Sequence, residues 1–225
     1  MATSAPVLSD LQKRVISAVI LFPLTIFLLM IGEPYNNWFI ATIFFLTLVE
    51  WMKLTLKTSF PLSTKSKYFI VGFAYIVIGF AGFWHIDFQK QVAVLGLVVI
   101  NDIAAFFVGK TVGGAKLAPS ISPNKTWSGS IGGFCITLAI SGLFLWHIDS
   151  AIPLSVMVFI GFLIIVAQLG DLLESWVKRQ YGVKDSGSII PGHGGLLDRL
   201  DSLIAVSIIM LLCHLKIINI NQLVF

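Results

Sequence analysis

The chain has 225 residues, of which 57% are hydrophobic and only 12% are charged, and 18 are phenylalanine. A soluble domain cannot bury that much apolar surface, so the composition excludes a soluble enzyme and indicates a polytopic membrane protein. This length is enough for several membrane spans but leaves no room for an added soluble domain. We therefore predict a single transmembrane domain over residues 1–225.

Seven apolar segments are long enough to cross a bilayer as helices, since about 20 residues span the hydrocarbon core. The first follows Lys13-Arg14 and resembles a signal peptide, but Gly32-Glu33-Pro34 follows it instead of a small-residue cleavage site. We interpret it as an uncleaved span. The predicted spans are 15–32, 37–56, 68–84, 91–109, 129–146, 153–173 and 196–215. The expected fold class is all-α, with about seven transmembrane helices.

Basic residues are distributed unequally between the two sides of this layout. If the N-terminus is cytosolic, only Lys90 and Lys216 of the 15 basic residues fall on the outer side. Positive residues concentrate on cytosolic loops of membrane proteins, so we expect a cytosolic N-terminus. The acidic residues follow the same asymmetry, which predicts a polar cavity that opens to the cytosol.

The first polar stretch, 101–133, begins at the end of the fourth span. Lys110 and Lys116 flank Gly113-Gly114, a composition that lets backbone N–H groups approach phosphate. It lacks the Walker pattern, so alone it is a weak signal. Further on, the segment 122–127 predicts a helix start, with serine at the N-cap and proline at N1. Two glycines four residues apart, 129 and 133, predict close helix packing.

The second polar stretch, 170–202, lies between two apolar spans and holds five of the eleven acidic residues. A charge inside the membrane core costs about 2.5–3.5 kcal/mol, so such a cluster marks a functional site by default. Asp171, Glu174 and Lys178 share one helical face by their spacing. Asp198 and Asp201 repeat that spacing after a Gly-rich loop. Carboxylates beside a basic, Gly-rich loop suit Mg²⁺ and phosphate oxygens. A loop that only fixes topology would not need glycines on both sides of His193.

The order of residues in this stretch resembles the signature of the phosphatidate cytidylyltransferases, or CDP-diacylglycerol synthases. The matching run is Ser175-x-x-Lys178-Arg179-x4-Lys184-Asp185…Pro191-Gly192-His193-Gly194-Gly195-x-x-Asp198-Arg199-x-Asp201. The 101–133 stretch is similar to the family's Ser-Pro-x-Lys-Thr-Trp-Glu-Gly motif, except that Ser128 replaces glutamate. Ala104 and Phe106 stand where glycine and tyrosine are common. The resemblance covers roughly the second half of the chain, which is shorter than many members that carry additional N-terminal helices.

The resemblance implies that CTP and phosphatidate give CDP-diacylglycerol and pyrophosphate with Mg²⁺; whether a monovalent cation accompanies the Mg²⁺ stays open. It also implies an integral protein of the bacterial inner membrane with its active site facing the cytosol. The expected catalytic residues are Asp171, Lys178, Asp198 and Asp201. The expected metal ligands are Asp171 and Asp198, with Asp102 and Asp201 as secondary ligands or orienting groups. The expected binding residues for phosphate, nucleotide or head group are Lys110, Lys125, Lys178, Arg179, Lys184, His193 and Arg199.

Several alternatives stay open at this point. A CTP-dependent lipid kinase of the dolichol-kinase type has similar polar loops but transfers the γ-phosphoryl group. A secondary transporter is disfavoured, because its site lies at the midplane between repeats and no repeat is visible here. His193 either donates to a phosphate or braces the loop, and Glu50 is either a site residue or an anchor at the cytosolic end of its span. The expected partners are the bilayer, CTP and phosphatidate, with no nucleic acid; a homodimer is compatible with the sequence.

Overall fold

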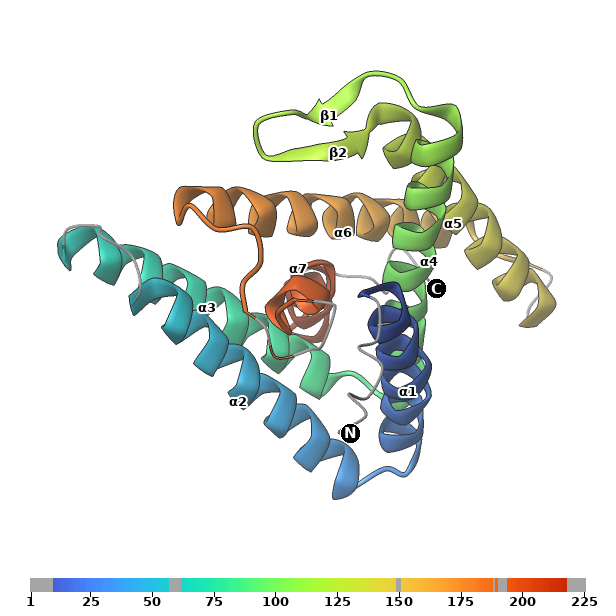
Figure 1. Ribbon diagram of the computed structural model, residues 1–225. Coiled ribbons are helices and arrows are strands. Elements are labelled where there is room, and N and C mark those ends of the chain that lie inside the picture. Colours follow the sequence, from blue (N-terminus) through green and yellow to red (C-terminus); the bar gives the residue numbers. More distant parts are fainter. Residues whose placement is uncertain (1–9, 57–61, 149–150, 188, 190–193, 218–225) are drawn as a thin grey trace, which may run out of the picture.

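A computed structural model describes residues 10–56, 62–148, 151–187, 189 and 194–217. Within these ranges the chain forms seven helices and one two-stranded hairpin (Figure 1). The helices are α1 Asp10–Met30, α2 Tyr35–Leu56, α3 Leu62–His85, α4 Phe88–Val112, α5 Trp127–Ile148, α6 Leu154–Gln180 and α7 Leu197–His214. The hairpin joins β1 Lys116–Ala118 to β2 Ser122–Thr126. Each predicted span coincides with one helix, which confirms the all-α class.

Helix α7 lies between α6 and the α2–α3 pair and also contacts α4 (Figure 1). Its buried side chains contribute to both apolar cores. In the larger core, Val206 of α7 packs with Leu29 of α1 and Ile164 of α6. In the smaller core, Ile204 packs with Trp51 of α2. The residues at the start of α7 are therefore held in the middle of the molecule.

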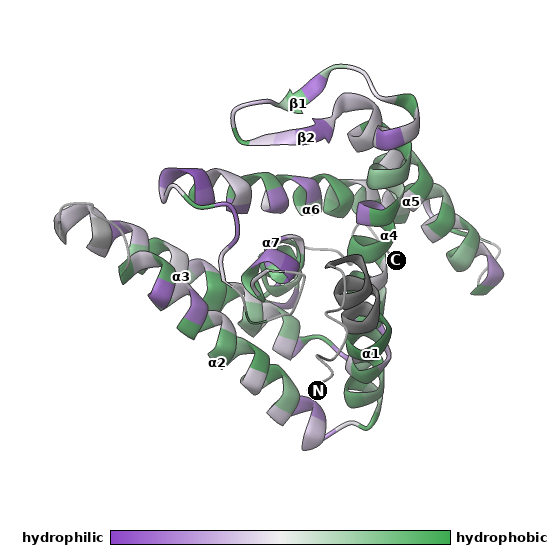
Figure 2. Cartoon of the chain, viewed as in Figure 1, coloured by the Kyte–Doolittle hydropathy of each residue, from purple (hydrophilic) through white to green (hydrophobic). Residues whose placement is uncertain are grey.

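Five of the helices are long and apolar enough to cross a membrane, namely α2 to α6. Helix α7 is not in that group, because three of its 18 residues are charged, namely Asp198, Arg199 and Asp201. Large apolar side chains are exposed over much of the molecule, among them Phe144 and Val158. Figure 2 shows green, hydrophobic residues along most of the length of these helices. Such a surface requires a lipid environment.

The hairpin corrects one prediction from the sequence. Ser122 and Pro123 do not start a helix but belong to β2, which pairs antiparallel with β1. Helix α5 starts later, at Trp127, and the Oγ1 of Thr126 accepts from the N–H of Gly129. Pairing with β1 gives the backbone of 122–126 its partners, and threonine provides the cap that the sequence pattern assigned to serine.

Two glycines allow α5 to pack closely against α4, as predicted. A Cβ at Gly129 would lie 2.7 Å from the carbonyl oxygen of Ala105, and one at Gly133 would lie 2.9 Å from the Ala105 side chain. Only glycine fits at these positions. The contact fixes the C-terminal half of α4, which carries Asn101 and Asp102, against α5.

Helix α4 starts at a charged cap. The side chain of Asp87 accepts from the backbone N–H of Lys90 at 3.0 Å, and the Lys90 ammonium lies 2.5 Å from the same carboxylate. These interactions with Lys90 lower the pKa of the Asp87 carboxyl. Stability from this cap is therefore present above the ordinary aspartate pKa and is lost as the pH falls through the lowered value.

Candidate active site

An apolar cavity of about 680 Å³ is lined mainly by α1, α2, α3, α4 and α7. Most of its lining is aliphatic or aromatic, with Leu29, Phe80 and Val99 as examples. One region of the wall is charged instead. It consists of Asp102 from α4, Asp171 from α6, and Asp198, Arg199 and Asp201 from α7. The cavity thus combines a large apolar volume with an acidic end that holds one arginine.

A polar cavity of about 540 Å³ lies on the other side of Asp102 and Asp171, which line both spaces. Its walls come from the end of α4, the hairpin, the start of α5 and the middle of α6. Three lysines line it, namely Lys110, Lys116 and Lys125. Two spaces of different chemistry therefore meet at two carboxylates.

The Gly-Lys loop between α4 and β1 forms one wall of the polar cavity. Gly113 and Gly114 have φ angles of +67° and +102°, which residues with a Cβ rarely adopt. The hydroxyl of Ser128, which stands where the family's glutamate is usual, donates to the carbonyl of Gly113. Ser128 thus braces the loop by a hydrogen bond.

Asp171 and Lys125 form an ion pair at the junction of the cavities. Asp102 is close enough to interact electrostatically with Asp171, Lys125 and Arg199. Asp201, which accepts from the backbone N–H of Ser202 at 2.6 Å, is repelled by both Asp102 and Asp171. The structure therefore brings three of the predicted acidic residues and two of the predicted cations to one place.

A neutral polar network supports this junction, and the sequence analysis missed it. The Nε2 of Gln168 donates to Asn101 Oδ1 at 2.9 Å and to the carbonyl of Ser130 at 3.0 Å, while the Ser130 hydroxyl donates back to Gln168. Gln168 precedes Asp171 by one helical turn, and Asn101 directly precedes Asp102. Polar residues next to acidic residues inside apolar helices are the signal that could have identified this network.

Comparison with known proteins agrees with this arrangement. A model of the cytidylyltransferase family matches residues 58–216. The phosphatidate cytidylyltransferase of Brucella suis is 35% identical over 91% of this chain and 93% of its own length. That of Bacillus subtilis is 51% identical over 47% of this chain and 40% of its own length. The chain belongs to the cytidylyltransferase family.

This member of the cytidylyltransferase family is shortened internally. The alignment with the Brucella suis protein has 257 positions, although this chain has only 225 residues and only 91% of those residues are included. Many aligned positions are therefore gaps in this chain. Most of the extra length of that relative therefore lies within the aligned region.

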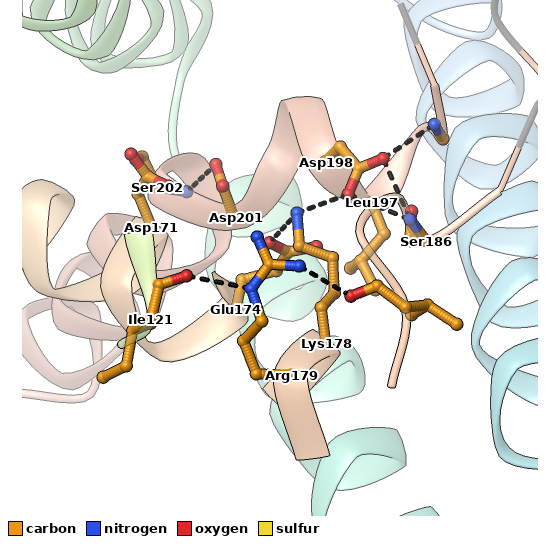
Figure 3. A network of polar contacts seen from close by, with 12 residues as sticks. Ile121, Asp171, Glu174, Lys178, Arg179, Ser186, Leu197, Asp198, Asp201 and Ser202 are labelled. Carbon is orange, nitrogen blue, oxygen red and sulfur yellow. Dashed lines mark hydrogen bonds and ion pairs between the residues drawn. The ribbon is translucent and has the colours of Figure 1, made fainter. Parts of the chain in front are cut away.

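Two charged residues of the family signature, Lys178 and Asp198, form a buried group with Glu174 near the start of α7 (Figure 3). The ammonium of Lys178 lies 2.6 Å from Glu174 and 2.7 Å from Asp198. Asp198 also accepts from the backbone N–H groups of Ser186 and Gly195, at 3.0 Å and 2.8 Å. Through these contacts Asp198 holds the loop between α6 and α7. Its role as a metal ligand stays a prediction.

Besides Lys178, two other predicted phosphate-binding residues, Arg179 and Lys184, line neither cavity. Arg179 donates to the carbonyls of Ile121 and Val183, each at 3.0 Å, and so joins the end of α6 to the hairpin (Figure 3). Lys184 is exposed on the loop after α6. Arg199, in contrast, lines the apolar cavity beside the acidic residues. His193 lies outside the described residues, so its two alternatives stand as predictions.

The junction suits a magnesium ion that is shared with substrate. Asp102 and Asp171 present hard carboxylate oxygens to both cavities. Among the residues that the structure describes, no group of three or more histidine, cysteine, aspartate or glutamate side chains is arranged to enclose a metal. Mg²⁺ usually binds one or two carboxylates and completes its shell with water and substrate phosphates. Two carboxylates beside a lysine-lined cavity are a donor set of this kind.

Proposed function

We propose that this protein transfers the cytidylyl group of CTP to phosphatidate, which gives CDP-diacylglycerol and pyrophosphate. The observation that carries the proposal is the meeting of an apolar and a lysine-lined cavity at Asp102 and Asp171. A reaction between a lipid and a nucleotide needs one space of each kind. Relatives named phosphatidate cytidylyltransferase, similar over most of the chain, support the same reaction.

The apolar cavity is the proposed site of the lipid. Its aliphatic walls suit the acyl chains, and its charged end contains Arg199, which suits an anionic phosphate head group. The head group would then lie beside Asp171, at the border with the polar cavity. Part of each acyl chain stays in the bilayer, because a cavity of about 680 Å³ is smaller than a whole phosphatidate with two long chains.

The polar cavity is the proposed site of CTP. Its three lysines, Lys110, Lys116 and Lys125, offset the negative charge of a triphosphate. The backbone of Gly113-Gly114 has no side chains that would keep phosphate oxygens away. Because Lys125 pairs with Asp171, the α-phosphate would lie close to the lipid head group.

In the proposed reaction, a phosphate oxygen of phosphatidate attacks the α-phosphorus of CTP. The new P–O bond forms as the bond from the α-phosphorus to the bridging oxygen breaks, and pyrophosphate leaves with that electron pair. Lys125 and Arg199 lower the repulsion between the two anions, and the lysines of the polar cavity stabilise the departing charge. We propose that Asp102 and Asp171 hold Mg²⁺, which supplies Lewis-acid charge stabilisation when bound.

We further propose that the charged ends of α6 and α7 face the cytosol of a bacterial inner membrane. The distribution of basic residues supports this orientation, and CTP is a cytosolic nucleotide. A homodimer and a second, monovalent cation remain predictions from the sequence and its family resemblance.

A direct assay tests the proposed function. Purified protein in mixed micelles should release pyrophosphate from CTP only when both phosphatidate and Mg²⁺ are present, with one CDP-diacylglycerol formed per pyrophosphate. Diacylglycerol in place of phosphatidate serves as the control, because it lacks the attacking phosphate. Turnover with diacylglycerol, or no turnover with phosphatidate, would contradict the proposal.

A further inference from the structure

Glu50 of α2 connects two parts of the chain that are far apart in the sequence. Its side chain is only 2% exposed. Its Oε2 accepts from the backbone N–H of Leu197 at 2.7 Å and from the hydroxyl of Ser186 at 3.1 Å. Leu197 is the first residue of α7, and Ser186 lies in the loop that leads to it; Figure 3 shows both beside Asp198. Glu50 therefore contacts the loop and the helix start together.

Helix α7 lacks an N-cap side chain of its own. Leu196 occupies the N-cap position and offers no side-chain acceptor. The first N–H groups of a helix have no partner within the helix and carry partial positive charge. The carboxylate of Glu50 accepts one of them, and Asp198 accepts the N–H of Gly195 just before it. A glutamate from another helix thus caps α7.

Two glycines of the loop leave the space that the Glu50 carboxylate occupies. A Cβ at Gly187 would lie 2.7 Å from the Glu50 Cδ, and one at Gly195 would lie 2.5 Å from its Oε1. Real Cβ atoms essentially never approach other atoms this closely. The loop therefore closes tightly around this carboxylate, and neither glycine can become alanine without displacing it.

We propose that Glu50 is a positioning residue for cytidylyl transfer, because it fixes the point at which α7 starts. One turn further along α7, Arg199 and Asp201 line the apolar cavity beside Asp171. A shift of the helix start would move both side chains relative to the lipid head group. The inference rests on the proposed function for its catalytic consequence, whereas the cap itself is a property of the fold.

The first test compares Glu50 with a matched residue on the same helix. Thr47 is fully buried one turn earlier, and its hydroxyl donates to the carbonyl of Ile43 in its own helix. We expect Glu50→Ala to lower kcat by about 100-fold, since a misplacement of about 1 Å can cost that much. Glu50→Gln, whose amide oxygen still accepts from Leu197, should retain an intermediate rate. Thr47→Val should keep kcat within about twofold of the wild type, because the Thr47 hydroxyl bonds within α2 and does not hold the loop before α7.

Hydrogen–deuterium exchange provides a readout that does not depend on activity. Loss of one buried acceptor should speed exchange in residues 194–200 about tenfold in Glu50→Ala, which corresponds to the loss of one hydrogen bond. Exchange within α2 and α4 should not change, and Thr47→Val should leave residues 194–200 as protected as the wild type. Equal exchange in this segment in Glu50→Ala and wild type would overturn the proposal.

A double-mutant cycle tests the direct contact. Gly187→Ala should lower kcat at least about tenfold in the wild type, because its methyl group displaces the carboxylate. In the Glu50→Ala background the space is free, so the same change should cost less than about twofold. Additive losses would overturn the proposal. If Glu50→Ala does not fold, Glu50→Ser, which also shortens the side chain and frees the same space, offers the same cycle. If the wild type makes no CDP-diacylglycerol, the proposed function fails, and the exchange experiment still decides the role of Glu50 at α7.

Discussion

The ammonium of Lys125 and the carboxylate of Asp171 form an ion pair at the border of an apolar and a polar cavity. Lys125 comes from the hairpin strand β2, and Asp171 comes from the middle of α6. The pair thus links the hairpin to a helix that also faces the apolar space. A transfer between nucleotide and lipid would occur beside this pair.

Removal of the lysine charge should therefore impair turnover strongly. We expect Lys125→Met to lower kcat at least about 100-fold, as loss of one preorganised positive donor does in other active sites. Lys184→Met, which removes an exposed lysine that lines neither cavity, should cost less than about threefold. Steady-state kinetics with CTP and phosphatidate check both variants. Comparable losses would show that Lys184 binds substrate after all.

The effect of replacing an aspartate on turnover should depend on what its carboxylate contacts. Asp102→Asn and Asp171→Asn each remove a carboxylate that faces both cavities, so turnover should fall at least about 100-fold with the fold retained. Both variants should also need more Mg²⁺ for half-maximal rate. Asp87→Asn, at the N-cap of α4, is the control, and its turnover and Mg²⁺ requirement should match those of the wild type. A normal Mg²⁺ requirement in both site variants would remove these residues from the metal site.

Asp198→Asn should behave differently from the other two. Asp198 accepts from Lys178 and from two backbone N–H groups, so its loss leaves a buried ammonium with one partner fewer. Breaking a buried charge pair costs about 3–5 kcal/mol. We expect a clear fall in the thermal unfolding temperature in detergent, together with loss of activity. An unfolding temperature equal to that of the wild type would favour a role in metal binding instead.

The apolar cavity makes a separate prediction for the lipid. Val99 lines this cavity, whereas Val158 of α6 is 62% exposed on the outer surface. Val99→Trp should raise the KM for phosphatidate about tenfold by filling space that the acyl chains use, and the KM for CTP should stay unchanged. Val158→Trp has the same change in volume and should alter neither value. An increase in the KM for CTP alone would contradict the assignment of this cavity to the lipid.

The sequence predicted the seven helices well because apolar runs of membrane length have few alternatives to a helix. It also singled out Asp102, Asp171 and Asp201, which the structure brings together, since carboxylates inside apolar helices are costly unless they are used. It could not identify the β-hairpin, because Ser122-Pro123 matches the pattern of a helix start and only pairing with β1 decides otherwise. Nor could it assign Glu50, whose partners Ser186 and Leu197 lie 136 and 147 residues away.

The same limit applies to the signature residues. The spacing of Lys178 and Asp198 in the sequence fits phosphate and metal binding, but the structure pairs them with each other. Two residues on separate helices meet only through tertiary packing, which one sequence does not reveal. Ser186 is a further example, since it is buried and bonded to Glu50 although it lies in a polar loop.

Membrane orientation is best tested at an exposed residue of that loop. In a variant without the native Cys135 and Cys213, a cysteine at Lys184 should react with a membrane-impermeant thiol reagent only from the cytosolic side. A cysteine at Lys90, an exposed residue in the first turn of α4, should react only from outside. The reverse pattern would overturn the proposed orientation and the cytosolic CTP site with it.

The measurement that tests the central claim most directly follows the label of CTP that is labelled at either the α- or the γ-phosphorus. In cytidylyl transfer the α-phosphorus is attacked, so label at that position should enter the lipid product. Label at the γ-phosphorus should leave as water-soluble pyrophosphate. If the γ-label instead appears in lipid and free CDP accumulates, the protein is a CTP-dependent lipid kinase, and the proposed cytidylyl transfer is wrong.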